Sequence, residues 1–252
     1  MAAPVKNLKW YKALTDKKGR LSAGAFLAEG EKAIRQITGC HPEAIIEIVA
    51  SGEPPLDLQK YAVRTVSESQ FRYISSSRTP QGIAAVVKIS PDIYSARLPA
   101  DAGNKILLLE DIQDPGNTGT LIRTAAAFNF SGVILTDKCA DPLSPRVVQA
   151  TAGAVLSLWL RATPQYRELV RSLRENGYSL IAAELNGTDK PDVLRRGKFV
   201  LALGNEAAGL SPGLLEMADF HVRIPIAQQK AESLNAAVCG GILMYLTTDK
   251  EE

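Results

Sequence analysis

Continuous apolar runs separated by helical segments dominate the second half of the chain and constrain its fold most. Four such runs lie at residues 106–109, 133–135, 179–183 and 199–203. A strand without polar alternation is buried on both faces, as in a parallel sheet. Helices are expected between and after these runs, at residues 120–128, 146–150 and 166–176. The second half is therefore predicted to be an α/β domain whose parallel sheet is covered on both faces.

The first 90 residues show a different pattern of short strands alternating with short helices. Helices are expected at residues 8–14, 31–38 and 68–74, and strands at 25–28, 44–50, 63–66 and 83–87. This pattern predicts a second, smaller α/β unit. Residues 91–104 lack periodicity and are rich in Pro, Ala, Gly and Asp, which indicates a linker. We therefore expect two domains, at residues 1–98 and 99–252.

Several function classes are disfavoured by what the sequence lacks. No apolar run reaches the length of a membrane helix, and residues 1–10 do not read as a secretory signal, so a cytoplasmic protein without membrane association is expected. Three widely separated cysteines and two histidines suggest neither a disulfide framework nor a metal site. Both histidines, His41 and His221, are interpreted as structural.

The positive charge is concentrated near the N-terminus. Residues 1–25 contain six Lys and Arg residues and a single Asp, a local net charge of +5, whereas the whole chain carries only +2. Such a stretch can bind phosphates, although a solvated helix face would have the same composition.

Polar residues follow the predicted strands at the edge where parallel sheets bind ligands. After the first strand, an Asp-Pro-Gly turn leads to Asn117 at an expected helix start, and Arg123 follows on an otherwise apolar stretch. An arginine in such surroundings needs a partner. That partner is either a carboxylate such as Asp114, which would make Arg123 structural, or the phosphate or ribose of a ligand.

Two further loops carry candidate ligand-binding residues. The loop Gly204–Ser211 has the glycine spacing of a phosphate loop, but Leu210 stands where a lysine is required. Binding of a nucleoside triphosphate is therefore disfavoured. Glu206 within this loop suggests a different ligand cradle. Ser233 and Asn235 precede a helix expected at 236–245, where either could act as a cap. That helix is apolar all round, which indicates burial in the domain or in an interface.

Taken in order, Asn117–Arg123, Gly204–Gly209 and Ser233–Asn235 resemble the three signature motifs of the SpoU-type (TrmH-like) branch of the SPOUT methyltransferases. The resemblance covers roughly residues 105–248. Residues 7–88, with Phe26–Gly30 and Pro80–Val86, resemble the ribosomal-protein-like RNA-binding domain often found ahead of that core. The family implies a deep C-terminal trefoil knot and a homodimer. One departure is that Gln228 and Gln229 stand where the family usually has a glycine, which affects the cofactor pocket rim.

The resemblance also implies a set of site residues. The cofactor S-adenosyl-L-methionine (AdoMet) would be held by backbone around five residues: Ala183, Leu203, Gly204, Ile224 and Leu234. The substrate ribose would be surrounded by Asn117, Arg123, Glu206, Ser233 and Asn235. Because arginine is essentially always protonated, Arg123 is expected to bind a phosphate or lower the pKa of the hydroxyl, while Glu206 or a water accepts the proton.

These expectations add up to AdoMet-dependent methylation of a ribose 2'-hydroxyl in structured RNA. The N-terminal domain favours ribosomal RNA over transfer RNA as the substrate. One alternative is a non-catalytic RNA-binding or ribosome assembly factor on the same fold, but the intact motif residues argue against lost catalysis. Another is a base-methylating relative, which should lack the pairing of Asn117 with Arg123.

Overall fold

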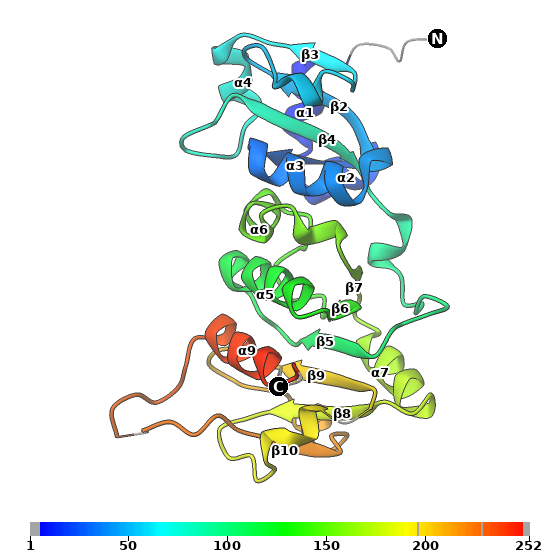
Figure 1. Ribbon diagram of the computed structural model, residues 1–252, viewed down its shortest axis with the longest axis vertical. Helices are drawn as coiled ribbons and strands as arrows, with labels where there is room; N and C mark the ends of the chain where they lie inside the picture. The colour runs from blue at the N-terminus through cyan, green and yellow to red at the C-terminus, as the bar shows by residue number, and fades with distance from the viewer. Residues whose placement is uncertain (1–5, 196, 228, 249–252) are drawn as a thin grey trace. The chain divides into compact units, whose positions relative to one another are not determined.

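The computed structural model describes residues 6–195, 197–227 and 229–248. The chain divides into two compact units (Figure 1). One unit comprises Met1–Pro91 together with Leu143–Ser157, and the other comprises Asp92–Pro142 together with Leu158–Glu252. A segment from the middle of the sequence, 143–157, thus belongs to the same compact unit as the N-terminal residues.

The first unit is a four-stranded sheet in the order β1-β4-β2-β3. Its strands are β1 (Ala25–Glu29), β2 (Ile45–Ala50), β3 (Val63–Thr65) and β4 (Ile83–Lys88). β4 runs antiparallel to β1 and β2, whereas β3 is parallel to β2. Its helices are α1 (Leu8–Ala13), α2 (Lys17–Ala23), α3 (Glu31–Cys40), α4 (Glu68–Ile74) and α6 (Pro145–Thr151). α2 was not expected from the sequence.

Arg20, one of the charges of the basic N-terminal stretch, is buried near the core of this unit. Tyr11 and Leu14 of the α1 region pack with Phe71 of α4 and with apolar side chains of the sheet. Arg20 is only 2% exposed, and its guanidinium donates to the backbone oxygens of Leu14 and Thr15. Arg20 therefore braces the turn between α1 and α2, and the basic stretch exposes fewer charges than the sequence suggests.

The second unit contains a six-stranded sheet in the order β10-β8-β9-β5-β6-β7, and every neighbouring pair is parallel. The strands are β5 (Lys105–Leu109), β6 (Gly132–Leu135), β7 (Trp159–Ala162), β8 (Ser179–Ala183), β9 (Phe199–Leu203) and β10 (Phe220–Val222). This arrangement confirms the predicted α/β class with a parallel sheet. The trefoil knot implied by the resemblance stays a prediction.

Helices cover both faces of this sheet, and strand alternation determines which residues each face presents. On one face, Ile106 and Leu108 pack with Leu169 and Val170 of α7 (Tyr166–Glu175). On the other, α5 (Pro115–Ala127) packs against α9 (Ala236–Tyr245), as Figure 1 shows. A Cβ atom at Gly240 would lie 2.3 Å from a methyl carbon of Leu121 and 2.7 Å from one of Leu203, so a larger residue would separate α9 from α5 and the sheet.

Two details of the second unit differ from the sequence-based expectations. α5 starts at Pro115 rather than near residue 120, because the Asp114 carboxylate accepts a hydrogen bond from the Asn117 backbone N–H and caps the helix. The strands β7 and β10 and the short helix α8 (Pro212–Leu215) were not expected. In both units, no helix among the described residues is long and apolar enough to cross a membrane.

Candidate active site

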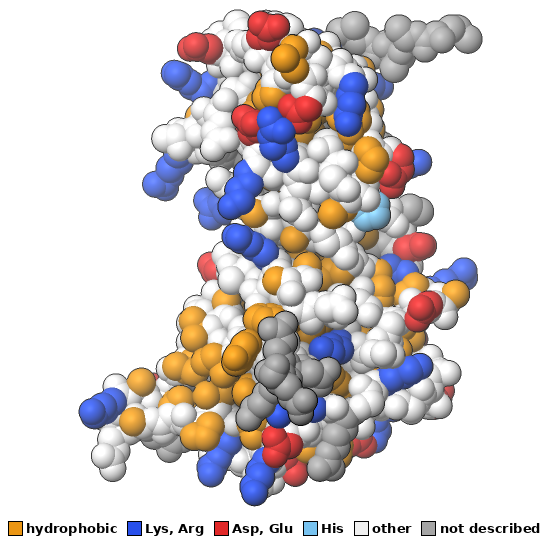
Figure 2. Space-filling view, viewed as in Figure 1, with side chains coloured by type: hydrophobic (Ala, Val, Ile, Leu, Met, Phe, Trp, Pro, Cys, Tyr) orange, Lys and Arg blue, Asp and Glu red, His pale blue; other side chains and the backbone are white. Residues whose placement is uncertain are grey.

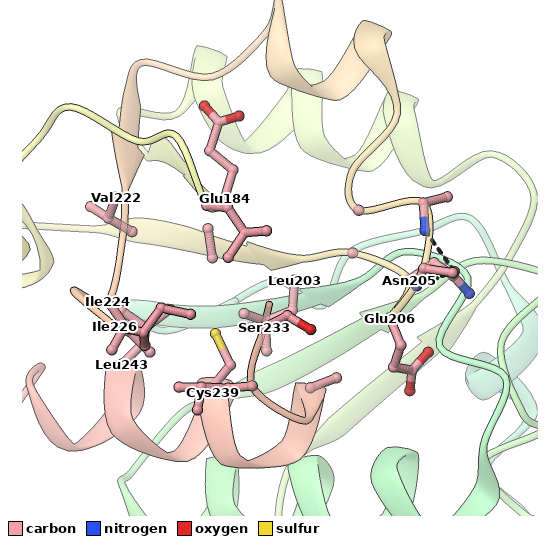
Figure 3. A pocket seen from close by; sticks show the side chains of 18 residues that line it. Glu184, Leu203, Asn205, Glu206, Val222, Ile224, Ile226, Ser233, Cys239 and Leu243 are labelled. Carbon is pink, nitrogen blue, oxygen red and sulfur yellow. Dashed lines mark hydrogen bonds between the residues drawn. The ribbon is translucent and has the colours of Figure 1, made fainter. Parts of the chain in front are cut away.

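The carboxyl ends of β8, β9 and β10 surround a cavity of about 270 Å³. The loop after β9, Gly204–Gly209, forms one wall, and residues before and within α9 form another (Figure 3). Apolar side chains of Ile224, Ile226 and Leu243 contribute to the lining. An amphipathic cavity with exposed backbone at strand ends suits a small organic ligand with an apolar ring system.

The five residues predicted to hold a cofactor are all brought together here. Ala183 ends β8, Leu203 ends β9 and Gly204 begins the loop, while Ile224 and Leu234 come from the segment between β10 and α9. All five line the cavity. Their contacts with a cofactor stay a prediction.

A continuous chain of side-chain hydrogen bonds connects the three sequence motifs at the edge of this cavity. The Asn235 Nδ2 amide donates to Asn117 Oδ1 at 3.0 Å, and Asn117 Nδ2 donates to Glu206 Oε1 at 2.7 Å. Asn235 Oδ1 in turn accepts from the backbone N–H groups of Ala237 and Val238 at the start of α9. Asn117 is thereby joined in one polar network to Glu206, 89 positions away in the sequence, and to Asn235, 118 positions away.

This network resolves the capping alternative raised for Ser233 and Asn235. Asn235 is the N-cap of α9, and its amide nitrogen also reaches Asn117, so the residue both caps the helix and joins the site. Ser233 does not cap α9; it is exposed and lines the cavity. The two positions therefore differ in role.

Arg123 stands apart from the other four predicted ribose-binding residues. It is exposed, it does not line the cavity, and its guanidinium makes no hydrogen bond or ion pair within the described ranges of the chain. Asp114, considered above as its structural partner, is occupied with capping α5. The alternative in which Arg123 braces the core is therefore wrong. Because it points to solvent, Arg123 is available to a ligand.

Sequence reasoning did not identify several residues of the cavity. Glu184, Cys239 and Leu243 also line it, and the Glu184 carboxylate points away from the apolar side chains in Figure 3. Glu184 Oε1 lies 2.6 Å from Nδ1 of His221 on β10. Burial raises the pKa of the Cys239 thiol. The apolar character of the 236–245 segment was visible in the sequence, but nothing there shows which of its side chains face the cavity.

Two further sequence observations concern the Gln228-Gln229 departure and metal binding. Gln228 lies outside the described residues, so the effect of the Gln228-Gln229 departure is not addressed by the structure, although Gln229 is exposed. Among the residues that are described, no group of three or more His, Cys, Asp or Glu side chains could hold a metal ion.

The fold and these motifs define a class of protein with known members. The SpoU rRNA Methylase family matches residues 104–245, and the MRM3-like substrate binding domain matches residues 5–85. The chain therefore belongs to the SpoU rRNA methylase family. The resemblance inferred from the three motifs is confirmed, as is the prediction of an RNA methyltransferase.

Individual relatives match over nearly the whole chain. A Bacillus subtilis protein named 23S rRNA (guanosine(2553)-2'-O)-methyltransferase RlmP is 34% identical over 251 residues, covering 97% of this chain and 96% of the relative. The crystal structure of an AdoMet-bound rRNA methyltransferase from Sinorhizobium meliloti aligns with a TM-score of 0.80 and 30% identity, covering 98% of this chain and 96% of the other. A putative RNA methyltransferase of the TrmH family from Porphyromonas gingivalis aligns with a TM-score of 0.79 and 28% identity over 98% of each chain.

Proposed function

We propose that this protein transfers a methyl group from AdoMet to a ribose 2'-hydroxyl in structured RNA, with ribosomal RNA as its substrate. The observation that carries this proposal is the hydrogen-bonded chain Asn235–Asn117–Glu206 beside the strand-end cavity. It joins a carboxylate able to accept a proton to a cavity able to hold the methyl donor. The names of the Bacillus and Sinorhizobium relatives, which specify rRNA methylation, support the same chemistry.

The cavity residues fit AdoMet by their chemistry. The apolar side chains of Ile224, Ile226 and Leu243 suit an adenine ring, and the backbone of Leu203 and Gly204 offers hydrogen-bonding groups at a strand end. The carboxylate of Glu206, also at the lining, favours a ligand that carries positive charge. When bound, AdoMet supplies an electrophilic methyl group on a sulfonium.

The protein's own residues then position and deprotonate the hydroxyl. Glu206 is exposed, and its Oε1 is held by Asn117. Its Oε2 accepts no hydrogen bond from the residues that the structure describes, so this oxygen is available to take the hydroxyl proton. Ser233 lines the same cavity and can hydrogen-bond the ribose.

Arg123 serves the phosphate of the substrate in this proposal. It lies six residues after Asn117 on α5, which corresponds to about 9 Å along the helix axis. Its exposed guanidinium can form bidentate bonds with a backbone phosphate. Such a contact fixes the nucleotide while Glu206 acts on its hydroxyl, and it does not require Arg123 to lose a proton.

We assign substrate RNA binding to residues 1–98 and methyl transfer to residues 99–252. Support for the first assignment comes from the basic stretch with Lys9, Lys12, Lys17 and Lys18, and from the match to a substrate binding domain. Lysines near phosphates make RNA affinity fall steeply with salt. Because rRNA is its substrate in this proposal, we place the enzyme in the cytoplasm.

The exposed side of α9 supports a homodimer. Val238, Ile242 and Tyr245 are 51%, 36% and 63% exposed, although the helix is apolar. Figure 2 shows hydrophobic side chains gathered over this region of the second unit. An exposed apolar patch on a soluble domain marks an interaction site, and a second copy of the chain with the same patch is a self-complementary partner.

The decisive experiment maps ribose methylation in ribosomal and transfer RNA from cells with and without the gene. We expect one ribose position in ribosomal RNA to lose its methyl group, and to regain it with the wild-type gene but not with Asn117→Ala. Unmethylated RNA from the deletion strain should then accept methyl from AdoMet when mixed with the purified protein. Restoration by Asn117→Ala would remove Asn117 from the proposed mechanism, and an unchanged methylation map with AdoMet binding intact would indicate a non-catalytic RNA-binding protein.

A further inference from the structure

A buried carboxylate binds Ser211, two residues after the loop that carries Glu206, and it has no part in the methyl transfer proposed above. Glu110 follows β5 and is only 4% exposed. Three donors converge on it: the Tyr166 hydroxyl and the Ser211 hydroxyl each donate to Oε1 at 2.7 Å, and the Ser211 backbone N–H donates to Oε2 at 2.6 Å. A buried charge is tolerated only where it is satisfied in this way.

The positively charged Arg167 is linked to Glu110 through two hydroxyl groups. The Arg167 guanidinium donates to the Tyr166 hydroxyl at 3.2 Å and to the Ser211 hydroxyl at 3.3 Å. Both oxygens therefore accept from the cation and direct their protons to the carboxylate. Burial and the bond to Glu110 raise the pKa of Tyr166, so its hydroxyl stays protonated and continues to donate.

This arrangement holds the chain just beyond the far end of the loop Gly204–Gly209, where Ser211 precedes α8. Ser211 donates to the Glu110 carboxylate through both its backbone N–H and its hydroxyl. At the near end, Asn205 Nδ2 donates to the backbone oxygen of Asp111 at 2.8 Å, and the Asn205 and Gly209 backbones exchange hydrogen bonds. Both ends of the loop are thus tied to residues 110 and 111, which lead directly into the segment that carries Asn117.

We propose that Glu110 is a positioning residue for methyl transfer, which holds Ser211 and hence the loop so that Glu206 stays within hydrogen-bond reach of Asn117. The inference rests on the proposed function, because it requires Glu206 to act on the ribose hydroxyl. Glu110 itself is buried and does not contact the substrate. Its effect passes from the end of β5 through Ser211 to the loop.

A carboxylate is required at this position because all three neighbours are donors. A carboxylate only accepts, whereas an amide must present an NH2 group to one side. In Glu110→Gln, the NH2 group faces either the Ser211 N–H or the two hydroxyls whose oxygens already accept from Arg167. Either orientation leaves a donor without an acceptor in a buried place and weakens the attachment of the loop.

The test compares Glu110→Gln with wild type and with Glu168→Gln, a carboxylate-to-amide change on the exposed surface of α7. We expect kcat at saturating AdoMet and RNA to fall by about 10- to 100-fold in Glu110→Gln, the scale of misplacing a reacting group. The Kd values for AdoMet and RNA should change far less, and Glu168→Gln should match wild type. Equal kcat in Glu110→Gln and wild type would overturn the inference.

A double variant distinguishes positioning from a general structural role. If Glu110 acts through Glu206, then Glu110→Gln should lower kcat little further once Glu206→Ala is present, whereas additive losses would contradict the inference. If Glu206→Ala alone keeps full activity, then the proposed role of Glu206 fails and the inference fails with it. Loss in Glu206→Ala with none in Glu110→Gln defeats only the inference.

Ser211 supplies a second route if Glu110→Gln does not fold. Ser211→Thr keeps the hydroxyl that Glu110 accepts from, and Ser211→Ala removes it while retaining the backbone donor. We expect a lower kcat in Ser211→Ala and recovery in Ser211→Thr. Equal kcat values for Ser211→Ala and wild type would count against the attachment, whatever Glu110→Gln does.

Discussion

Replacing Arg123 by alanine separates a ligand-binding arginine from a structural one. The side chain is exposed on α5 and has no partner among the residues that the structure describes. The free energy of unfolding should therefore change by no more than about 0.5 kcal/mol, as at other surface sites. Had Arg123 formed a buried ion pair, its loss would cost about 3–5 kcal/mol.

Activity should respond very differently. If Arg123 binds the substrate phosphate, methyl transfer in Arg123→Ala should fall by about 100-fold, which corresponds to ~2.7 kcal/mol of transition-state stabilisation. AdoMet affinity should be unchanged, because Arg123 does not line the cavity. Arg123→Lys keeps the charge but loses the planar fork, so its activity should stay low if bidentate contact matters.

The assay measures transfer of radiolabelled methyl from AdoMet to unmethylated RNA, beside thermal unfolding and calorimetry with AdoMet. Arg171→Ala is a matched control, because Arg171 is also exposed on a helix of the second unit, α7, and makes no described side-chain contact. A stable Arg123→Ala enzyme with the turnover of Arg171→Ala would remove Arg123 from the mechanism. A large loss of stability would instead refute the reading of the structure.

Two further predictions concern the cavity. In Gly204→Ala, the new Cβ would lie 2.2 Å from the Gly209 carbonyl carbon and 2.3 Å from the Leu210 nitrogen, so the loop must move. AdoMet affinity measured by calorimetry should therefore fall about tenfold or more. Unchanged affinity would place the cofactor elsewhere. Because burial raises the pKa of Cys239, iodoacetamide at neutral pH should alkylate Cys239 at least about tenfold more slowly than the exposed Cys40. Bound AdoMet should slow alkylation of Cys239 further. Peptide mass spectrometry measures both rates. Similar rates at both thiols would show that Cys239 is not enclosed.

The sheet of the second unit was largely predictable because its strands are continuous apolar runs. Two strands escaped prediction for identifiable reasons. β7 contains Arg161, which is 5% exposed and donates to the backbone oxygens of Arg97 and Leu160, so a buried charge interrupts the apolar pattern. β10 has only three residues, Phe220–Val222, too short a segment for periodicity to be visible.

The membership of the segment 143–157 could not have been predicted. Val147 and Val148 of α6 are buried, and the helix packs against β1 of the first unit. An apolar helix face has the same sequence pattern whichever sheet it covers. Chain order therefore suggested one continuous catalytic region after residue 98, whereas the compact unit that includes β1 also includes α6.

Some residues of the site could be predicted from the sequence, whereas those that depend on tertiary packing could not. Asn117, Glu206 and Asn235 could be selected from the sequence because polar residues at strand ends and helix starts indicate ligand binding. Glu110 also directly follows a strand, but nothing in the sequence shows that its carboxylate is buried against other side chains. Its burial depends on Tyr166 and Ser211, which are 56 and 101 positions away.

The chemistry of the Asn235–Asn117–Glu206 chain leaves only one orientation for each amide. A carboxylate can only accept, so Asn117 must direct Nδ2 to Glu206 and therefore Oδ1 to Asn235. Asn235 must then donate through Nδ2, which leaves its Oδ1 for the backbone N–H groups that begin α9. Successive donors thus run from the positive end of a helix to the carboxylate, and each bond polarises the next. Glu206 consequently holds its negative charge at the end of a preorganised chain. Its Oε2 accepts no hydrogen bond from the described residues, and in the proposed mechanism this oxygen takes the hydroxyl proton.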